Sequence, residues 1–226
     1  GGGEAKQLYL HTSPELAMKR LIISGATAIY RAGSVFRNGE RSAHHEPEFL
    51  MVEWYRVGAD LADLIRECEA LIKAIFEESE AFGFQPPKMP RTFPVIELPA
   101  LFTKYTGVDP LADFEGANFA RALEKQGMGP FAKNPSYQEV FYQVVVERLE
   151  PIFQELGTFF LKDFPAPLAI LSRRSTEDPR IAKRVEAYIC GVEIANGFEE
   201  LTDPVEQRER FEDDLRIRAS EGHHLP

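Results

Sequence analysis

The stretch that decides the fold is VFRNGERSAHHEPEFLMVEWY, residues 35–55. It predicts a strand that ends beside Arg37, a long polar loop over residues 37–48 and a second strand over residues 49–55. The second strand is apolar on both faces, which is typical of a central strand, yet it carries a carboxylate at Glu53. A carboxylate there is costly unless a cation lies against it. We therefore expect this segment to hold an anionic and a cationic group close together.

Such a segment suits an enzyme that handles ATP together with a charged amine. Arg37 has the planar guanidinium that matches a phosphate or a carboxylate, although a surface ion pair would also explain it. Glu53 either forms an ion pair inside the protein or meets a cation of a ligand, and the pattern leaves both open. His44 and His45 are neighbours, so their side chains diverge on an extended backbone and do not easily share one metal ion.

The composition is that of an ordinary globular protein. The chain has 226 residues, 44% hydrophobic and 27% charged, which is enough for one large domain or two small ones. A net charge of −10 argues against nonspecific nucleic-acid binding through a basic surface. The two cysteines, Cys68 and Cys190, lack metal-ligand spacing, so we expect free buried thiols and a cytoplasmic location. No apolar run is long enough for a membrane span.

The pattern along the chain predicts an α+β fold. Helices are expected at residues 14–23, 60–82, 99–105, 137–156 and 204–220, and a loop with an amphipathic helix at residues 109–129. Strands are expected at residues 8–10, 28–36, 49–55, 93–98, 159–161 and 168–171, and a strand pair at residues 185–194. Pro151 is expected to bend or break the helix that contains it. We predict one partial catalytic domain over residues 1–226, with a mostly helical insertion at residues 92–157. His223 and His224 are expected to be solvated.

A second group of carboxylates lies in the run EAYICGVEIANGFEEL, residues 186–201. If this hairpin turns at its Cys-Gly dipeptide, Tyr188 faces Glu193. Glu186 then faces Ala195, and both glutamates share one sheet face. Two carboxylates on one face repel each other unless a cation lies between them. Mg²⁺ that also binds phosphates is one such cation, and an exposed face with Arg or Lys partners is the alternative.

Three segments, in this order, resemble class II aminoacyl-tRNA synthetases of the lysine type. They are TSPELAMKRL at residues 12–21, FRN with HEPEF and EWY within residues 36–55, and EIANGFEEL at residues 193–201. EWYR, EIANGF, ELTD and the TED at residues 176–178 are similar to one branch of this family, which attaches (R)-β-lysine to a lysine of elongation factor P. The resemblance covers about residues 8–55 and 175–218.

The resemblance implies an ATP-dependent ligase that activates lysine or (R)-β-lysine as an acyl-adenylate. The implied acceptor is a lysine of elongation factor P, with tRNA(Lys) as the alternative. A third possibility is a paralogue that binds without catalysis, although the retained charged residues argue against it. The implied cofactors are ATP and Mg²⁺, and the implied assembly is a homodimer without a membrane partner.

The resemblance also assigns roles to residues. Arg37 would be catalytic, at the α-phosphate and the substrate carboxylate. The ATP-binding set would be Arg37, Asn38, Glu40, His45 and Phe49. The substrate-binding set would be Glu15, Glu53, Tyr55, Asn196, Phe198 and Glu200. In that set Glu53, Tyr55 and Glu200 would hold the distal ammonium. Glu186 and Glu193 would bind Mg²⁺ on the phosphates.

The chain departs from the family pattern in two ways. The family usually has Phe-Arg-x-Glu, whereas here Gly39 stands at the last place and Glu40 follows, which puts adenine recognition in doubt. The first class II motif is expected before Gly1 and the third after Pro226. We therefore expect a class II synthetase-like antiparallel sheet flanked by helices and incomplete at both ends. A piece without these two motifs holds only part of the expected site and is not expected to be active alone.

Overall fold

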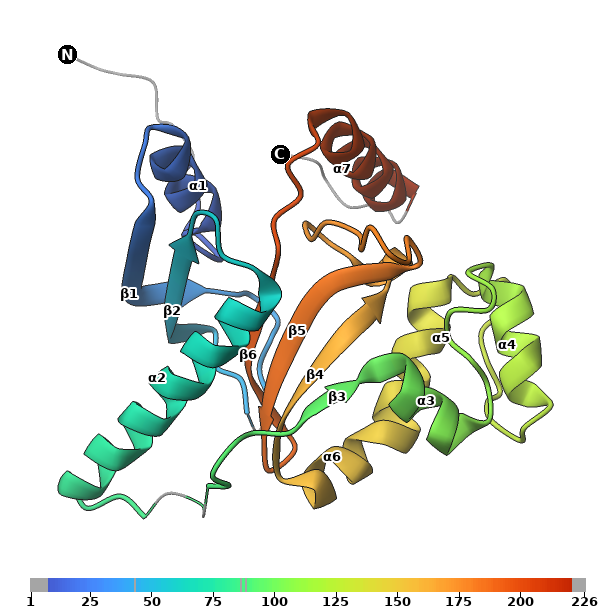
Figure 1. The fold of residues 1–226 in the computed structure, drawn as a ribbon. Coiled ribbons are helices and arrows are strands. Elements are labelled where there is room, and N and C mark those ends of the chain that lie inside the picture. The colour runs from blue at the N-terminus through green and yellow to red at the C-terminus, as the bar shows by residue number, and fades with distance from the viewer. Residues whose placement is uncertain (1–7, 43, 86, 88, 221–226) are drawn as a thin grey trace. The chain divides into compact units, whose positions relative to one another are not determined.

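Figure 1 shows the chain in a computed structural model, which describes residues 8–42, 44–85, 87 and 89–220. The chain divides into two compact units, Gly1–Ala59 and Asp60–Pro226, which we call the N-terminal unit and the C-terminal unit. Both combine helices with antiparallel strands, which confirms the α+β class. Whether they form one catalytic domain stays a prediction. His223 and His224 lie outside the described residues.

The N-terminal unit consists of one helix and one strand pair. Helix α1 spans Glu15–Ile23, and strands β1 and β2 span Ala28–Phe36 and Glu48–Arg56. Ser13 Oγ accepts a hydrogen bond from the Glu15 backbone N–H at 2.9 Å, so a hydroxyl satisfies one donor at the start of the helix. The strand expected at residues 8–10 does not form, and these residues have no regular structure.

The register of β1 and β2 decides which side chains meet. The strands are antiparallel, and Arg31 lies opposite Glu53 while Val35 lies opposite Phe49. Because paired residues point to the same face, the odd-numbered residues of both strands line one face. We call this the odd face of the N-terminal unit.

The opposite face of β1 and β2 is apolar and exposed. Tyr30 is 80% exposed and Leu50 is 78% exposed. Within the described residues β2 pairs with β1 alone. The expectation of a central strand is therefore not met in the described part of the chain, because the second apolar face has no layer over it there.

The C-terminal unit is built on a four-stranded sheet in the order β3-β4-β5-β6. Its strands are β3 (Val95–Glu97), β4 (Thr158–Pro165), β5 (Ile181–Ile189) and β6 (Val192–Phe198). The β3–β4 pair is parallel and the other pairs are antiparallel. A 3₁₀ turn, Ala166–Leu168, stands where the strand at residues 168–171 was expected, because Pro165 and Pro167 favour a turn over a ladder.

Helices surround this sheet, and Figure 1 shows those of residues 98–156 gathered beside its β3 edge. The helices are α2 (Leu61–Ala81), α3 (Leu98–Thr106), α4 (Gly116–Glu124), α5 (Tyr137–Val144), α6 (Glu150–Leu156) and α7 (Pro204–Ser220). Stacked aromatic rings fill the space between α3, α4 and α5. Phe102 stacks on Phe141 with centroids 5.2 Å apart, and Phe119 stacks on Tyr137 at 4.7 Å. That residues 92–157 are an insertion stays a prediction.

The helix expected over residues 137–156 is interrupted rather than merely bent. A π-helical turn, Val145–Leu149, separates α5 from α6, and Pro151 lies in the first turn of α6. Proline has no N–H to donate, so it is tolerated in a first turn and not in a helix interior. The wider turn before it is where the regular hydrogen bonding changes.

Asn196 and Gly197 lie inside β6, although an Asn-Gly dipeptide is typical of a turn or a bulge. A Cβ atom on Gly197 would lie 2.6 Å from Leu64 Cδ2 of helix α2. Glycine at this position thus leaves room for the Leu64 side chain of α2 against the strand backbone.

The reactivity of Cys68 reports on the packing of α2, because this residue lies on α2 and is 6% exposed. Burial raises the pKa of the Cys68 thiol to about 11, so only about one molecule in a thousand carries the thiolate at pH 8. Cys190 is exposed, contrary to the expectation of two buried thiols, because it lies in the tight turn between β5 and β6.

We expect iodoacetamide at pH 8 to modify Cys190 and to leave Cys68 unmodified in the folded protein. Peptide mass spectrometry after timed labelling measures both rates. The same reaction in urea is the control, in which both thiols react. Equal rates in the folded protein would contradict the packing of α2 described above.

Candidate functional site

Arg37 and Phe49 come together at the end of the odd face. The guanidinium carbon of Arg37 lies 5.4 Å from the centre of the Phe49 ring, in a cation–π arrangement. The Arg37 backbone N–H donates to the Pro47 carbonyl at 2.8 Å, which closes the base of the loop. The guanidinium also lies 3.7 Å from the Glu40 carboxylate. A half-exposed cation over a partly exposed aromatic ring is suited to a nucleotide.

The loop between β1 and β2 presents the other residues predicted for ATP. Asn38, Glu40 and His45 are all exposed. The His45 ring is held by Ser42, whose Oγ lies 2.8 Å from Nδ1. This hydrogen bond orients the imidazole while leaving its far nitrogen at the surface.

Glu53 lies further along the same face and is held by two hydroxyls. Ser13 Oγ donates to one carboxylate oxygen at 2.5 Å, and the Tyr55 hydroxyl donates to the other at 3.3 Å. No ion pair to Glu53 occurs among the described residues. The sequence left open whether Glu53 forms an ion pair inside the protein or meets a ligand cation. In the described part of the chain the carboxylate has two hydroxyl donors and no cation.

Ser13 is a site residue that the sequence analysis missed. Its hydroxyl accepts a hydrogen bond at the start of α1 and also donates one to Glu53 of β2. Glu15, a member of the predicted substrate-binding set, accepts a hydrogen bond from Lys19 Nζ at 2.6 Å, one helical turn away. The signal for Ser13 was its place in the TSPE segment, but no spacing rule links residues 13 and 53.

The second group of predicted site residues lies on the β5–β6 hairpin of the C-terminal unit. The hairpin turns at Cys190 and Gly191, and Tyr188 lies opposite Glu193, as the sequence predicts. The register then shifts by one, so Glu186 lies opposite Asn196 and not Ala195. The predicted pairing of Glu186 was wrong because β6 contains a bulge, which inserts one residue.

This bulge re-aims the rest of β6. In a regular strand Glu193 and Asn196, three residues apart, would point to opposite faces. The extra residue places Asn196 and Phe198 on the face of Glu193 and Glu186. Beyond the strand, Glu200 continues in an antiparallel bridge with Ser172. Four of the predicted substrate and metal residues therefore share one face of the hairpin.

Glu186 and Arg184 form a buried ion pair on this face. Arg184 Nη2 lies 2.5 Å from Glu186 Oε1, and both side chains are 6% exposed. Tyr188 donates its hydroxyl to the other oxygen of Glu186 at 2.7 Å. Burial, together with the nearby Glu186 carboxylate, raises the pKa of Tyr188, so the hydroxyl keeps the proton that it donates.

Arg184 is satisfied by three further contacts that tie β5 to its surroundings. It donates to the Leu168 carbonyl at 3.1 Å and to the Asn196 side-chain oxygen at 3.2 Å, and its guanidinium lies 4.5 Å from the Phe164 ring centre. The side chain of Asn196, a member of the predicted substrate-binding set, is held in place by this hydrogen bond.

A magnesium ion does not fit Glu186 as the side chain is placed here. Both of its carboxylate oxygens already accept hydrogen bonds from protein donors, whereas Glu193 is exposed. Within the described residues no cluster of three or more His, Cys, Asp or Glu side chains could hold a metal ion. The assignment of Mg²⁺ to Glu186 and Glu193 stays a prediction, and no reaction step is derived through the ion.

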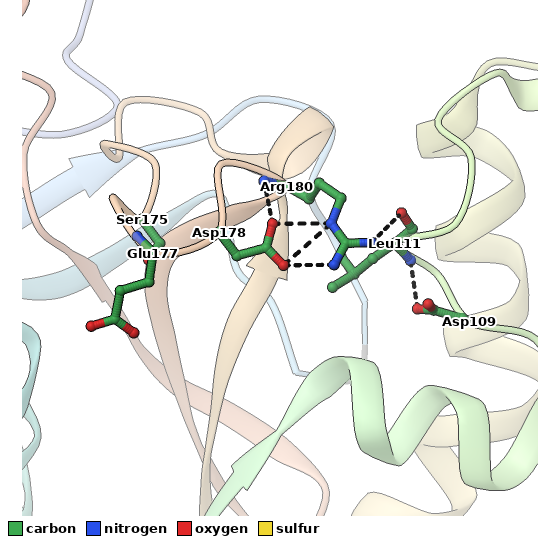
Figure 2. A network of polar contacts seen from close by, with 6 residues as sticks. All are labelled: Asp109, Leu111, Ser175, Glu177, Asp178 and Arg180. Atoms are coloured by element: carbon green, nitrogen blue, oxygen red, sulfur yellow. Dashed lines mark hydrogen bonds and ion pairs between the residues drawn. The ribbon is translucent and has the colours of Figure 1, made fainter.

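The TED segment at residues 176–178 has a structural role. Figure 2 shows Asp178 facing Arg180 while the Glu177 carboxylate points away from this pair. Arg180 Nη2 lies 2.7 Å from the Asp178 carboxylate, and its Nη1 donates to the Leu111 carbonyl at 3.5 Å. The hydrogen bonds from Arg180 hold the pKa of Asp178 below its usual range. The segment therefore fastens the loop before β5 to the chain around Leu111.

A cavity of about 570 Å³ in the C-terminal unit is separate from all these residues. Its walls come from the end of β3, α3, β4, the start of β5 and the loop before α4, and they include Glu97, Thr103, Lys104, Asp109 and Asp163. None of the predicted site residues lines it.

Residues 3–223 match the family model of tRNA synthetases class II (D, K and N). The chain belongs to this class II tRNA synthetase family. The match spans both units, and the site residues predicted from the resemblance therefore lie on a chain of the expected family. Among the described residues of this class II chain, no helix has the length and apolar character of a membrane span.

Curated relatives of this class II chain carry the name elongation factor P–(R)-β-lysine ligase. The protein of Erwinia tasmaniensis is 38% identical over 225 residues, and those of Pectobacterium atrosepticum and Yersinia enterocolitica are each 37% identical over 225 residues. Each alignment covers 98% of this chain and 65% of the relative. The chain thus spans 65% of the length of these relatives.

We expect Glu186→Gln and Glu193→Gln to differ in folding stability. Glu186→Gln leaves the buried Arg184 guanidinium without its counter-charge and should lower the free energy of unfolding by about 3 kcal/mol. Glu193→Gln removes an exposed carboxylate and should change it by less than about 0.5 kcal/mol. Urea unfolding followed by circular dichroism measures both. Equal effects would show that Glu186 is not the structural partner of Arg184.

Proposed function

We propose that the protein carrying this chain is an ATP-dependent ligase for (R)-β-lysine or lysine, with a lysine of elongation factor P as the acceptor. The observation that carries the proposal is the Glu53 carboxylate, which is half-buried, held by two hydroxyls and without a cation among the described residues. An ammonium group is the ligand that such a carboxylate favours. The names of the curated relatives support the same substrate and acceptor.

In the proposed first step a carboxylate oxygen of the amino acid attacks the α-phosphorus of ATP. The new P–O bond forms as the bond to the β-phosphate oxygen breaks, which gives an acyl-adenylate and pyrophosphate. Arg37 would stabilise negative charge at the α-phosphate, and Phe49, which it stacks on, would support the adenine. The step depends on positioning and charge neutralisation, which needs no general base.

In the proposed second step the amine of the acceptor lysine attacks the acyl carbon. AMP leaves with the electrons of the acyl C–O bond, and the nitrogen loses a proton to solvent. Magnesium on the ATP phosphates belongs to the proposal through the family resemblance, with Glu193 as the accessible ligand. A cytoplasmic homodimer is part of the same family expectation.

The proposal predicts pyrophosphate exchange and acceptor labelling. The protein as encoded by its gene should exchange pyrophosphate into ATP when (R)-β-lysine or lysine is present. With labelled amino acid, the label should pass to elongation factor P and not to tRNA(Lys). Labelling of the tRNA instead would favour a lysyl-tRNA synthetase, and no exchange with either amino acid would favour a paralogue without catalysis.

Glu53→Gln should raise the KM for the amino acid by at least about tenfold and leave the KM for ATP within about twofold. The reason is that the amide loses the charge that attracts the ammonium, which amounts to about 1.5–3 kcal/mol. Its oxygen can still accept a hydrogen bond from one of the two hydroxyls that hold Glu53. Glu78→Gln, an exposed glutamate on α2, is the matched control. Equal losses for both substrates would count against Glu53 as the ammonium partner.

A further inference from the structure

Arg31 on the odd face carries a donor that the described part of the protein leaves unused. Its Nη1 atom is buried and makes no hydrogen bond among the described residues. A buried donor on a charged group is costly to leave without a hydrogen-bond partner. Such an atom in a native structure calls for an acceptor, and a bound anion is one that also matches the charge.

The Arg31 side chain turns along β1 toward Gly33. A Cβ atom on Gly33 would lie 3.1 Å from Arg31 Nη2 and 3.2 Å from its Cζ, so the guanidinium lies where a larger residue would place its side chain. Gly33 has a negative φ, so its backbone does not require glycine. The missing side chain instead makes room for the guanidinium.

This orientation sets the order of charges on the odd face. Arg31 is opposite Glu53 in the register, yet its guanidinium lies over Gly33, which is opposite Met51. Two residues along a strand is about 6.6 Å, so the guanidinium is displaced by roughly that distance from Glu53. The displacement is toward Phe49 and Arg37, the end suited to a nucleotide.

We propose that Arg31 is a further substrate-binding residue, whose Nη1 donates to the carboxylate of the amino acid. The inference rests on the proposed function, in which Glu53 receives the ammonium and the carboxylate must reach the α-phosphate beside Arg37. Arg31 lies between these two places. It selects an amino acid, with a carboxylate and a distant ammonium, over a diamine that carries the ammonium alone.

The chemistry determines which kinetic constant Arg31 controls. The carboxylate carries its full charge in the bound substrate and loses it when the acyl-adenylate forms. A guanidinium at this position therefore stabilises the bound substrate at least as much as the transition state. Removing it should raise KM for the amino acid with little change in kcat.

The test compares ligands that differ in the carboxylate. Calorimetric titration of the protein as encoded by its gene uses (R)-β-lysine, lysine, 1,5-diaminopentane and ATP as probes. Arg31→Gln should weaken binding of both amino acids by at least about tenfold and leave 1,5-diaminopentane and ATP within about twofold. Glu53→Gln should weaken all three amines. Arg66→Gln, an exposed arginine on α2, is the matched control.

Gly33→Ala provides a second variant that keeps the charge. Its methyl group would push the guanidinium aside, which is cheap because the neighbour is the end of a flexible side chain. We expect a smaller loss in the same direction as for Arg31→Gln, with an unchanged circular dichroism spectrum. This variant also keeps the inference testable if Arg31→Gln does not fold.

The outcomes separate this inference from the proposed function. If Arg31→Gln and Gly33→Ala both bind lysine as tightly as the wild type, the inference is overturned and water satisfies Nη1. Pyrophosphate exchange by the wild type would still support the ligase in that case. A selective loss of ATP binding would also overturn it, because the anion would then be a phosphate. A wild type that binds lysine no better than 1,5-diaminopentane overturns it as well. Carboxylate-dependent binding without pyrophosphate exchange would support Arg31 and refute the ligase.

Discussion

A charged side chain in a β-strand must meet an opposite charge or a set of hydrogen-bond partners, and both units are organised by this constraint. In the C-terminal unit the constraint is met inside the protein. Arg184 and Glu186 form a buried ion pair, and Tyr188 supplies the remaining donor. Either charge would be costly to bury alone. The ion pair therefore favours the strand register in which both charges are buried together.

The N-terminal unit meets the same constraint differently. Arg31 and Glu53 are paired in the register, yet the guanidinium turns toward Gly33 and the carboxylate takes its hydrogen bonds from hydroxyls. A buried donor is left over on one residue and a carboxylate without a cation on the other, within the described part of the chain. The Arg31 guanidinium and the Glu53 carboxylate thus suit a zwitterionic ligand, whose carboxylate and ammonium would supply the two opposite charges.

Much of the candidate site could be read from residue types and periodicity. β-branched, aromatic and other apolar residues identified the strands predicted at residues 28–36 and 49–55, and the charged and aromatic residues of this segment pointed to Arg37, Phe49 and Glu53. The Cys-Gly turn was also predicted correctly. The bulge in β6 was not, because an extra residue leaves no mark in a sequence whose flanking residues are all acceptable in a strand.

The sequence by itself determined the family, the α+β class and most of the elements, because these depend on local patterns and on motifs a few residues long. Tertiary structure alone decided which polar groups meet. In the folded chain Ser13 donates a hydrogen bond to Glu53, 40 positions away, and the Arg31 guanidinium lies over Gly33. Glu186 forms its ion pair with Arg184. Partner choice of this kind depends on register, burial and side-chain direction, which are properties of the folded chain and not of any short segment.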